Sequence, residues 1–516
     1  MNRSFITLAV AALLLAPLAS LCGEPFAKPN IVYILADDLG YGDVQCLNPQ
    51  RGKIRTPNFD KLASQGMTFT DAHSGSSVCT PTRYGVLTGR YAWRTRLQSG
   101  VLEGFSAPLI ASGRLTVPAF LKQQGYSTLC VGKWHLGMNF AHSGNSEPKG
   151  SKARKAAFAV DWSKPIADGP VSCGFDTFFG ISASLDMPPF VYIENDRFTQ
   201  PATGTKKFVR SGPAAVDFEA VDVLPAFSHK ACESIAARAA DAKAGKPFFL
   251  YLPLNSPHTP LVPSKEWQGK SGLGDYGDFV MQTDAVVGEV LAALERNGLA
   301  ENTLVIATSD NGCAPYIGAA ELEAKGHFPS AQFRGYKADI WDGGHRVPFL
   351  VRWPGKVKAG SQSAQLVCHT DLMATCADLL GAKLPDTAGE DSVSILPALL
   401  GSDSNPIHEG VVHHSIKGRF AIRQGPWKLE FCPGSGGWAK PGDDEAKKLG
   451  LPDVQLYDVM ADAGETKNVQ SEHPDVVERL TKLLVQTGRS TPGAPQKNDV
   501  PVNLWKKGGA TAGASE

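Results

Sequence analysis

Runs of consecutive apolar residues alternate along the chain with segments of helical periodicity. Residues 30–36, 247–254 and 303–308 are short, unbroken, β-rich runs, a pattern typical of strands buried on both faces. Residues 279–296 instead repeat their apolar positions at helical spacing. This alternation predicts an α/β fold with a large, mostly parallel sheet flanked by helices.

Weaker signals predict further elements of the same kind. A helix is expected over residues 56–65, because Thr56 can cap it, Pro57 suits its first position and Gly66 can end it. We also predict a helix at 115–124 and strands at 67–70, 127–131 and 347–351.

The composition changes near residue 400. Residues 401–406 are loop-like, and strand-like pieces follow at 410–414, 420–423 and 427–431, with an amphipathic helix at 474–486. We therefore predict a main domain at residues 27–400 and a smaller C-terminal α+β subdomain at 401–490. Residues 491–516 are rich in Gly, Pro and Ala and are expected to be poorly ordered.

The first 22 residues have the pattern of a secretory signal peptide. Arg3 supplies a positive start and residues 5–16 are apolar. Because that stretch is shorter than a membrane span requires, we predict a periplasmic or extracellular protein without a transmembrane segment. Lipid anchoring through Cys22 is the alternative, and the bulky Leu21 before it disfavours that reading.

Composition narrows the classes of protein further. Lys and Arg number 51 and Asp and Glu also number 51, so the basic excess of a nucleic-acid-binding protein is missing. Apolar residues make up 42% of the chain and charged residues 20%, which is ordinary for a globular protein. The ten cysteines are scattered and do not form a disulfide framework, although one or two bridges stay open.

Two of the predicted strands end in acidic clusters. Asp37 and Asp38 follow the first strand, and Asp310 and Asn311 follow the strand at 303–308. Ligands bind at the carboxyl ends of parallel strands, and side chains that offer only oxygens suit Ca²⁺ or Mg²⁺. Either pair alone would be read as loop caps, but together they predict a divalent-cation site.

A cysteine motif provides the second chemical signal. Cys79 opens the sequence CTPTR, and LTGR follows at residues 87–90. Pro81 suits the first turn of a helix, which would place Cys79 at a helix N-terminus, where backbone amides favour an anion. The alternative is a buried structural cysteine.

In combination with the other motifs of the chain, this sequence resembles the type I, formylglycine-dependent sulfatases of the alkaline-phosphatase superfamily. The resemblance covers nearly the whole mature chain and includes DDLGYGD at 37–43, TPNFDKLASQG at 56–66, GKWHLG at 132–137, PHTPL at 257–261, SDNG at 309–312 and RGYKADIWDGGHRVPFLVRWPG at 334–355. It implies a sulfuric ester hydrolase in which a maturation enzyme oxidises Cys79 to formylglycine (3-oxoalanine).

The resemblance also implies the cofactor. One Ca²⁺ ion is expected on Asp37, Asp38, Asp310 and Asn311, with the residue made from Cys79 as a further ligand. One hydroxyl of the hydrated aldehyde would attack sulfur, and the other would then expel sulfate as the carbonyl re-forms.

Five cationic or titratable residues receive roles by the same resemblance. Arg83 would hold the hydrated aldehyde, and Lys133 and Lys337 would bind sulfate oxygens. His135 would orient or deprotonate the formylglycine hydroxyl, and His258 would protonate the leaving alcohol. For each of these residues alone, a solvated lysine or a core imidazole is the competing interpretation.

Three further substrate contacts rest on weaker signals. Ser184, in GISASLD, resembles a sulfate-contacting serine, and His345, in GGHR, is either a substrate contact or incidental. Arg94 lies in YAWRTR, which looks like bacterial sulfatases that act on galactose or N-acetylgalactosamine 6-sulfate, although a structural loop is the alternative. We expect a sulfated glycan as substrate. A phosphodiester or phosphonate monoester hydrolase and a non-catalytic sulfoglycan-binding protein are the competing functions.

Overall fold

The computed structural model describes residues 28–142, 160–402, 405–488, 498–500 and 502. The predicted signal peptide at residues 1–22 and Cys22 lie outside the described residues, as does most of the tail at 491–516. The nine cysteines of the described part are all free thiols.

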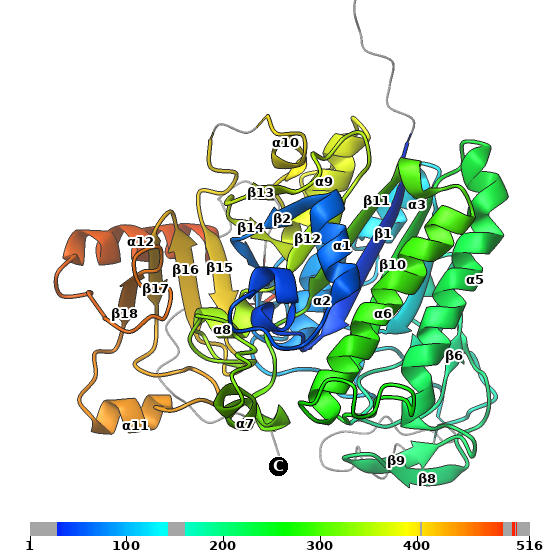
Figure 1. Ribbon diagram of the computed structural model, residues 1–516, viewed down its shortest axis with the longest axis horizontal. Helices are drawn as coiled ribbons and strands as arrows, with labels where there is room; N and C mark the ends of the chain where they lie inside the picture. Colours follow the sequence, from blue (N-terminus) through cyan, green and yellow to red (C-terminus); the bar gives the residue numbers. More distant parts are fainter. Residues whose placement is uncertain (1–27, 143–159, 403–404, 489–497, 501, 503–516) are drawn as a thin grey trace, which may run out of the picture.

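A ten-stranded sheet forms the centre of the molecule (Figure 1). Its strands follow the order β13-β2-β12-β11-β1-β10-β4-β5-β6-β7, and the five from β11 to β5 run parallel. These are β11 (Thr303–Ser309), β1 (Asn30–Asp37), β10 (Phe248–Pro257), β4 (Ser127–Lys133) and β5 (Thr177–Ile181). The outer strands are β13 (Ser361–Ser363), β2 (Met67–Phe69), β12 (Phe349–Arg352), β6 (Ile193–Glu194) and β7 (Arg197–Phe198).

Helices cover both faces of this sheet, as the unbroken apolar strands require. Alternate residues of β1 pack into two different cores, with Ile31 in one and Val32 in the other. The first core also contains residues of α2 (Cys79–Thr88), α3 (Val117–Gln123) and α9 (Leu372–Leu379), and the second those of α1 (Pro57–Gln65), α5 (Val223–Lys243) and α6 (Asp275–Arg296). The predicted α/β class with a mostly parallel sheet is confirmed.

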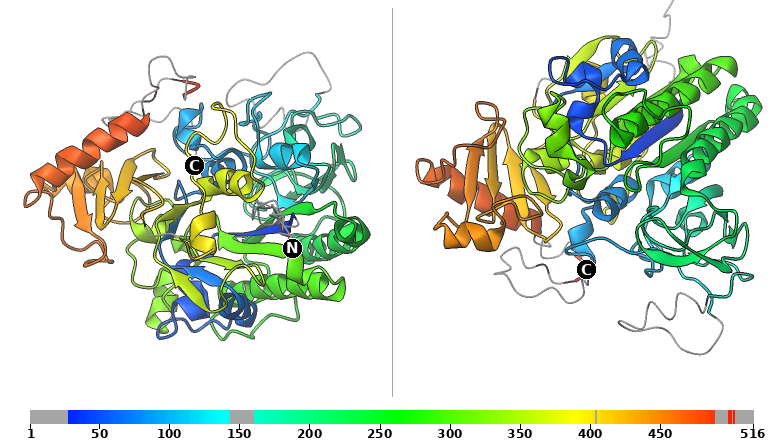
Figure 2. Two further views of the ribbon diagram at one scale, coloured as in Figure 1. Left: turned by 90° about the horizontal axis from the view of Figure 1, so that it is seen from above. Right: turned by 60° about the horizontal axis from the view of Figure 1, so that its bottom comes forward.

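A four-stranded antiparallel sheet forms a smaller C-terminal unit beside the main sheet (Figure 1 and Figure 2). Helix α12 (Pro474–Gly488) packs on it through Val476, Leu480 and Leu484. Its strands are β15 (Val411–His414), β16 (Phe420–Gln424), β17 (Trp427–Glu430) and β18 (Gln455–Asp458). The predicted C-terminal subdomain is present, and the exact boundary near residue 400 stays a prediction.

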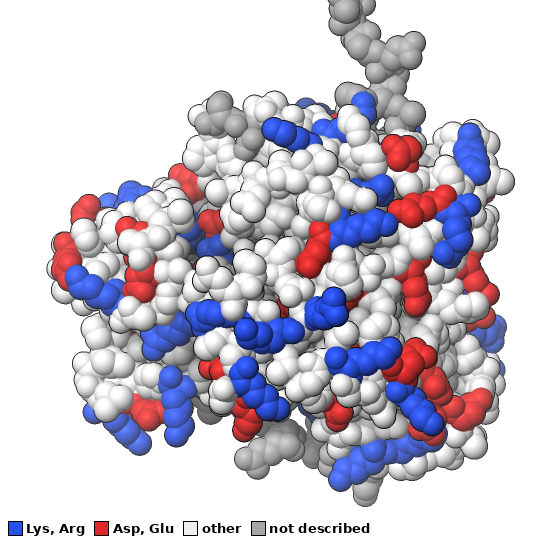
Figure 3. Space-filling view, in the orientation of Figure 1, with Lys and Arg blue, Asp and Glu red and all other residues white. Residues whose placement is uncertain are grey.

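Short elements complete the described structure. They are α7 (Ala319–Ala324), α8 (Asp342–His345), α10 (Leu396–Leu399), α11 (Asp443–Lys448), β3 (Ala72–His73), β14 (Val367–Cys368), β8 (Gly204–Lys207) and β9 (Ser211–Ala214). None of the helices among the described residues is long and apolar enough to traverse a bilayer. Acidic and basic side chains are interspersed over the face shown in Figure 3, in keeping with the balanced composition.

The sequence pattern missed one long helix. The 21 residues of α5 are rich in alanine, and only six of them are buried. Their apolar stripe is therefore too weak to stand out from the sequence. The strand predicted at 127–131 also extends further, to Lys133.

Candidate active site

Two adjacent parallel strands bring the acidic pairs together. Ala36 of β1 lies opposite Ser309 of β11, so the residues that follow each strand meet at one edge of the sheet. The backbone amide of Asp38 donates to Asp310 Oδ1 at 3.1 Å, and Asn311 Nδ2 donates to Asp38 Oδ1 at 2.8 Å. Asp38 has a φ of +65°, an unusual conformation for a non-glycine residue that is common at functional sites.

Cys79 is the first residue of α2 and lies against these carboxylates. One ligand atom from each of Asp37, Cys79 and Asp310 falls within 4.8 Å of the others. One turn later, the Arg83 guanidinium donates from Nε and Nη2 to Asp310 Oδ2 at 3.1 and 2.8 Å. Arg83 also donates to the carbonyl oxygen of Lys133 at 3.1 Å, so this one side chain ties the helix to two strand ends.

Two lysines contact the carboxylates of the cluster. Lys133 Nζ lies 2.6 Å from Asp37 Oδ2, and Lys337 Nζ lies 2.7 Å from Asp38 Oδ2. Their side chains are 0% and 5% exposed. Buried ammonium groups need such partners, and the same groups are suited to bind an anion that enters the site.

The two predicted histidines also lie in this region. His258 Nδ1 contacts the carbonyl oxygen of Thr259 at 2.6 Å, and its Nε2 faces Asp38 Oδ2 at 3.7 Å. His135 has a φ of +56°, so the simple strand alternation with Lys133 does not continue to it. Its Nε2 contacts the carbonyl oxygen of Leu102 at 2.7 Å, while its buried Nδ1 has no hydrogen-bond partner.

Ser184 lies at the edge of this cluster and donates a hydrogen bond to Asp186. Burial raises the pKa of Asp186, but the charge of His258 and the bond from Ser184 outweigh it, so the pKa is lowered. Arg210 Nη2 approaches the same carboxylate at 3.7 Å. Sequence reasoning assigned no role to Asp186, although it lies two residues after Ser184 in the GISASLD segment, and it missed Arg210, which carries no motif signal.

The structure does not bring Arg94 to the cluster. Its guanidinium is fully buried and donates to Asp391 at 2.5 and 2.7 Å and to Asn498 Oδ1 at 2.9 Å. It also lies over the Trp93 ring. These contacts occupy the donors of Arg94 in a structural ion pair, so we do not propose it as a substrate contact.

The structure does not bring His345 to the cluster either. Its ring is buried, contacts His73 at 3.0 Å and stacks on His413 with ring centroids 4.0 Å apart. The interpretation of His345 as a substrate contact is therefore replaced by a place in a separate group of histidines.

The charges of the cluster shift its acidities in opposite directions. Burial alone would raise the pKa of Asp37, but Lys133, His258 and Arg83 hold it well below the ordinary range. Burial and the charge of Asp37 raise the pKa of Asp310. Burial also raises the pKa of the Cys79 thiol, against the lowering effect of the two lysines. The neighbouring Asp37 and Asp310 carboxyl groups thus shift in opposite directions, with Asp37 favoured as the charged form.

The donor set fits a hard divalent cation. Asn311 Oδ1 is buried and accepts no hydrogen bond, and Asp37 Oδ1 has only an ion pair with Arg83 Nη2 at 3.4 Å. Such incomplete pairing is costly unless another group binds these oxygens. The carboxylates of Asp38 and Asp310 lie beside them. Oxygen-only ligands of this kind are those that Ca²⁺ and Mg²⁺ prefer. These four residues can therefore hold a metal ion.

Comparison with known proteins places the chain in a family. The sulfatase family model matches residues 29–382. The N-acetylgalactosamine-6-O-sulfatase of Bacteroides thetaiotaomicron is 34% identical, over 90% of this chain and 93% of that protein. Human arylsulfatase A is 33% identical, over 90% of this chain and 89% of its own length.

Solved structures agree with this placement. A structure from work on glycosaminoglycan metabolism by B. thetaiotaomicron has a TM-score of 0.77 and 34% identity, and covers 90% of this chain and 100% of that one. A Pseudoalteromonas sulfatase shares the fold, with a TM-score of 0.67 at 22% identity over 91% of this chain and 92% of that one. The chain belongs to the sulfatase family and is a sulfuric ester hydrolase.

Proposed function

We propose that this enzyme hydrolyses sulfate esters of carbohydrates, with N-acetylgalactosamine or galactose 6-sulfate as the preferred units. The observation that carries this proposal is the 34% identity to a protein named N-acetylgalactosamine-6-O-sulfatase, over 93% of its length. The buried Lys133 and Lys337, which pair with Asp37 and Asp38, support it, since ammonium groups can bind sulfate oxygens.

The nucleophile is the hydrate of a formylglycine made from Cys79. Cys79 begins a helix, where backbone amides stabilise negative charge. A thiol that attacked sulfur would be left in a stable adduct, whereas a hydrate can expel sulfate by re-forming its carbonyl. Intact mass measurement tests the conversion, because replacing the thiol by an aldehyde lowers the mass by about 18 Da.

Asp37, Asp38, Asp310 and Asn311 hold one Ca²⁺ ion in this proposal. The ion supplies positive charge that neutralises a sulfate oxygen and lowers the pKa of a neighbouring hydroxyl. The buried side-chain oxygens of Asp37 and Asn311 that accept no hydrogen bond support the assignment.

The other side chains of the cluster hold the nucleophile, bind the sulfate group and accept a proton. Arg83 lies one turn after Cys79, is fixed by its bonds to Asp310 and holds the hydrate in place. Lys133, Lys337 and Ser184 bind the sulfate oxygens, where negative charge persists through the transition state. His135 presents the lone pair of its unpartnered Nδ1 to the attacking hydroxyl.

His258 protonates the leaving alcohol. Its Nδ1 is bonded to the Thr259 carbonyl, which leaves Nε2 for proton transfer. Burial and Lys337 lower the pKa of His258 in the free enzyme. A bound sulfate ester brings negative charge that raises this pKa, so the acid forms with substrate.

A panel of defined sulfated sugars tests the substrate. Sulfate release should be fastest from N-acetylgalactosamine 6-sulfate or galactose 6-sulfate, and much slower from the 4-sulfated isomers. An aryl phosphodiester measured beside an aryl sulfate separates a phosphodiesterase from a sulfatase. A preference for 4-sulfate, or for the phosphodiester, would contradict the proposal.

The sequence of residues 1–22 supports export to the periplasm or the exterior. N-terminal sequencing of the mature protein tests this, since it should begin near residue 23.

A further inference from the structure

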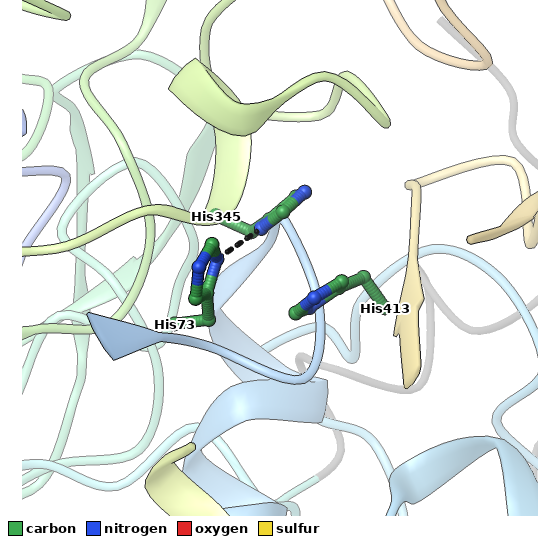
Figure 4. Close-up of side chains that lie close together, drawn as sticks. All are labelled: His73, His345 and His413. Atoms are coloured by element: carbon green, nitrogen blue, oxygen red, sulfur yellow. Dashed lines mark hydrogen bonds between the residues drawn. The ribbon is translucent and has the colours of Figure 1, made fainter. Parts of the chain in front are cut away.

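Three histidines from distant parts of the chain meet outside the active site (Figure 4). His73 ends β3, His345 ends α8 and His413 lies in β15 of the C-terminal sheet. None is more than 1% exposed. One ring nitrogen from each lies within 4.8 Å of the others. We call these three residues the histidine cluster.

The outer nitrogen of each ring faces a group that only accepts hydrogen bonds. His73 Nε2 lies 2.8 Å from Asp71 Oδ1, His345 Nε2 lies 3.0 Å from the Ile340 carbonyl, and His413 Nδ1 lies 3.0 Å from the Ser74 carbonyl. Each of these nitrogens therefore carries the proton of its ring. In neutral rings, the other nitrogens then hold lone pairs.

These lone pairs have nothing to bind. His73 Nδ1 and His345 Nδ1 are 3.0 Å apart, so two acceptors face each other at hydrogen-bond distance. His413 Nε2 is buried and has no hydrogen-bond partner. Leaving buried acceptors unsatisfied is costly. A cation among the three nitrogens removes the conflict.

A proton is poorly placed to be that cation. Burial lowers the pKa of all three histidines, and each ring is also disfavoured as a cation by a neighbouring cationic or imidazole group. One shared proton would in addition leave one of the three nitrogens without a partner. A metal ion can accept all three lone pairs at once.

We propose that His73 Nδ1, His345 Nδ1 and His413 Nε2 bind one divalent transition-metal ion, with Zn²⁺ as the fitting probe. Neutral imidazole is a preferred ligand of such ions. Metal-ligating histidines also donate their other N–H to a carboxylate or a backbone carbonyl, which is the arrangement of all three rings here.

The distances between the ring nitrogens suit this ion, whereas the orientation of one ring has to change. Tetrahedral Zn²⁺ with nitrogen ligands separates them by about 3.3 Å, between the 3.0 Å of His73 and His345 and the 4.8 Å limit of the cluster. His345 and His413 stack at an interplanar angle of 11°, so their lone pairs lie in nearly parallel planes. One of these rings must turn about χ2 to bring both nitrogens to one ion, and its hydrogen bond to the Ile340 or Ser74 carbonyl shifts with it.

The surroundings can compensate the charge of the ion. Asp71 and Asp342 lie next to the rings, at 2.8 Å from His73 and 3.8 Å from His345. The buried charged groups of this region are the carboxyl groups of Asp71, Asp342, Glu430 and Glu465 and the cations of Arg346, Arg423 and Lys428. Burial and the neighbouring Glu430 raise the pKa of Glu465 well above its ordinary range, so the remaining carboxylates and the cations nearly balance. Asp71 and Asp342, which contact the rings directly, supply the negative charge closest to an added cation.

Metal analysis of the full-length, untagged protein tests the site. Cells are grown with or without added Zn²⁺, and the protein is purified with excess Ca²⁺ so that oxygen-lined sites do not retain zinc. We expect one zinc per chain, three imidazole ligands by X-ray absorption at the zinc edge, and an unfolding temperature several degrees higher with zinc than without.

Matched histidine variants locate the ion. His413→Gln and His345→Val should each lose zinc, whereas His414→Gln should retain it, because His414 is equally buried in the same strand but outside the cluster. Zinc-free wild-type protein from zinc-supplemented cells would overturn the proposal. Retention of zinc by both cluster variants would also overturn it. If these variants do not fold, a wild-type spectrum with oxygen or sulfur ligands in place of imidazole would do so.

Discussion

The active-site cluster and the histidine cluster are both buried groups of titratable side chains, yet they are built differently. The first gathers at the ends of adjacent strands, from segments such as Asp37–Asp38 and Asp310–Asn311 that are recognisable in sequence. The second joins single residues from β3, α8 and β15. The difference shows that a site at strand ends is built from neighbouring residues in short sequence motifs. A site at the junction between two subdomains is built from residues that lie far apart in the sequence.

The largest expected effect is a loss of activity without a loss of stability, caused by a substitution in the active-site cluster. Cys79→Ala should abolish sulfate release, because the proposed nucleophile is removed. The unfolding midpoint should change little, since one small side chain is lost from a large core. Turnover is measured with an aryl sulfate and stability by denaturant unfolding. Retained turnover would refute the assignment of Cys79.

Lys133→Ala should lower kcat by about 10²- to 10³-fold, through loss of charge stabilisation at the sulfate. Lys122→Ala is the matched control, because Lys122 is half-exposed and pairs with Asp176 at the surface. Its kcat should stay within about twofold of wild type. A loss of tenfold or less in Lys133→Ala would mark this lysine as peripheral.

At the junction between the main domain and the C-terminal subdomain, a substitution is expected to lower stability rather than activity. Lys428 is fully buried and contacts Asp342, Glu430 and Glu465 at 2.9, 3.1 and 2.6 Å. Lys428→Met would leave Glu430 and Glu465 without this cation and Asp342 with Arg346 alone, at a cost of about 3–5 kcal/mol in the free energy of unfolding. Urea unfolding followed by fluorescence measures it. An unchanged midpoint would show that the buried network contributes no stability.

Acid should weaken the junction as well. The pKa values of His73, His345 and His413 are lowered in the folded protein, chiefly by burial. The unfolded chain therefore binds more protons below its ordinary histidine pKa of about 6.5. In protein freed of metal at the histidine cluster, stability should fall as the pH drops below that value, by up to about 1.4 kcal/mol per pH unit for each histidine. Urea unfolding between pH 7.5 and pH 5 (roughly the range where free imidazole titrates) checks the slope, and His413→Gln should reduce it.

The smallest effect is expected at the surface. Lys61 and Glu295 pair at 3.2 Å, with side chains 43% and 45% exposed. Solvent screens this ion pair, so Lys61→Ala should change the free energy of unfolding by less than about 1 kcal/mol. Measured beside Lys428→Met, it shows how far burial changes the importance of an ion pair. Equal losses in both variants would remove that distinction.

The sequence predicted the fold where local pattern and burial agree. The strands around residues 30, 250 and 303 were visible because both of their faces are buried. Helix α5 was not visible, because its weak apolar stripe does not distinguish it from a polar segment. Periodicity also could not show that His135 leaves the strand geometry with a positive φ.

The residues of the candidate site likewise include some whose placement the sequence predicted and others whose placement it did not. The placement of Cys79, Arg83 and the acidic pairs follows from motifs that lie at strand and helix ends. Arg94 and His345 also lie in motif-like segments, but their partners, Asp391 and His413, come from elsewhere in the chain. A single sequence does not reveal such distant pairings, and they decide what a buried arginine or histidine does.

The burial of helix α2 has a consequence for the timing of biosynthesis. Every residue from Cys79 to Thr88 is buried in the folded protein. If Cys79 is oxidised as proposed, the oxidising enzyme must therefore bind this segment before the helix packs, during or soon after synthesis. Packing of the helix ends access to Cys79, so chains that fold before oxidation should remain inactive. Incubating the folded protein with the maturation enzyme should not restore their activity.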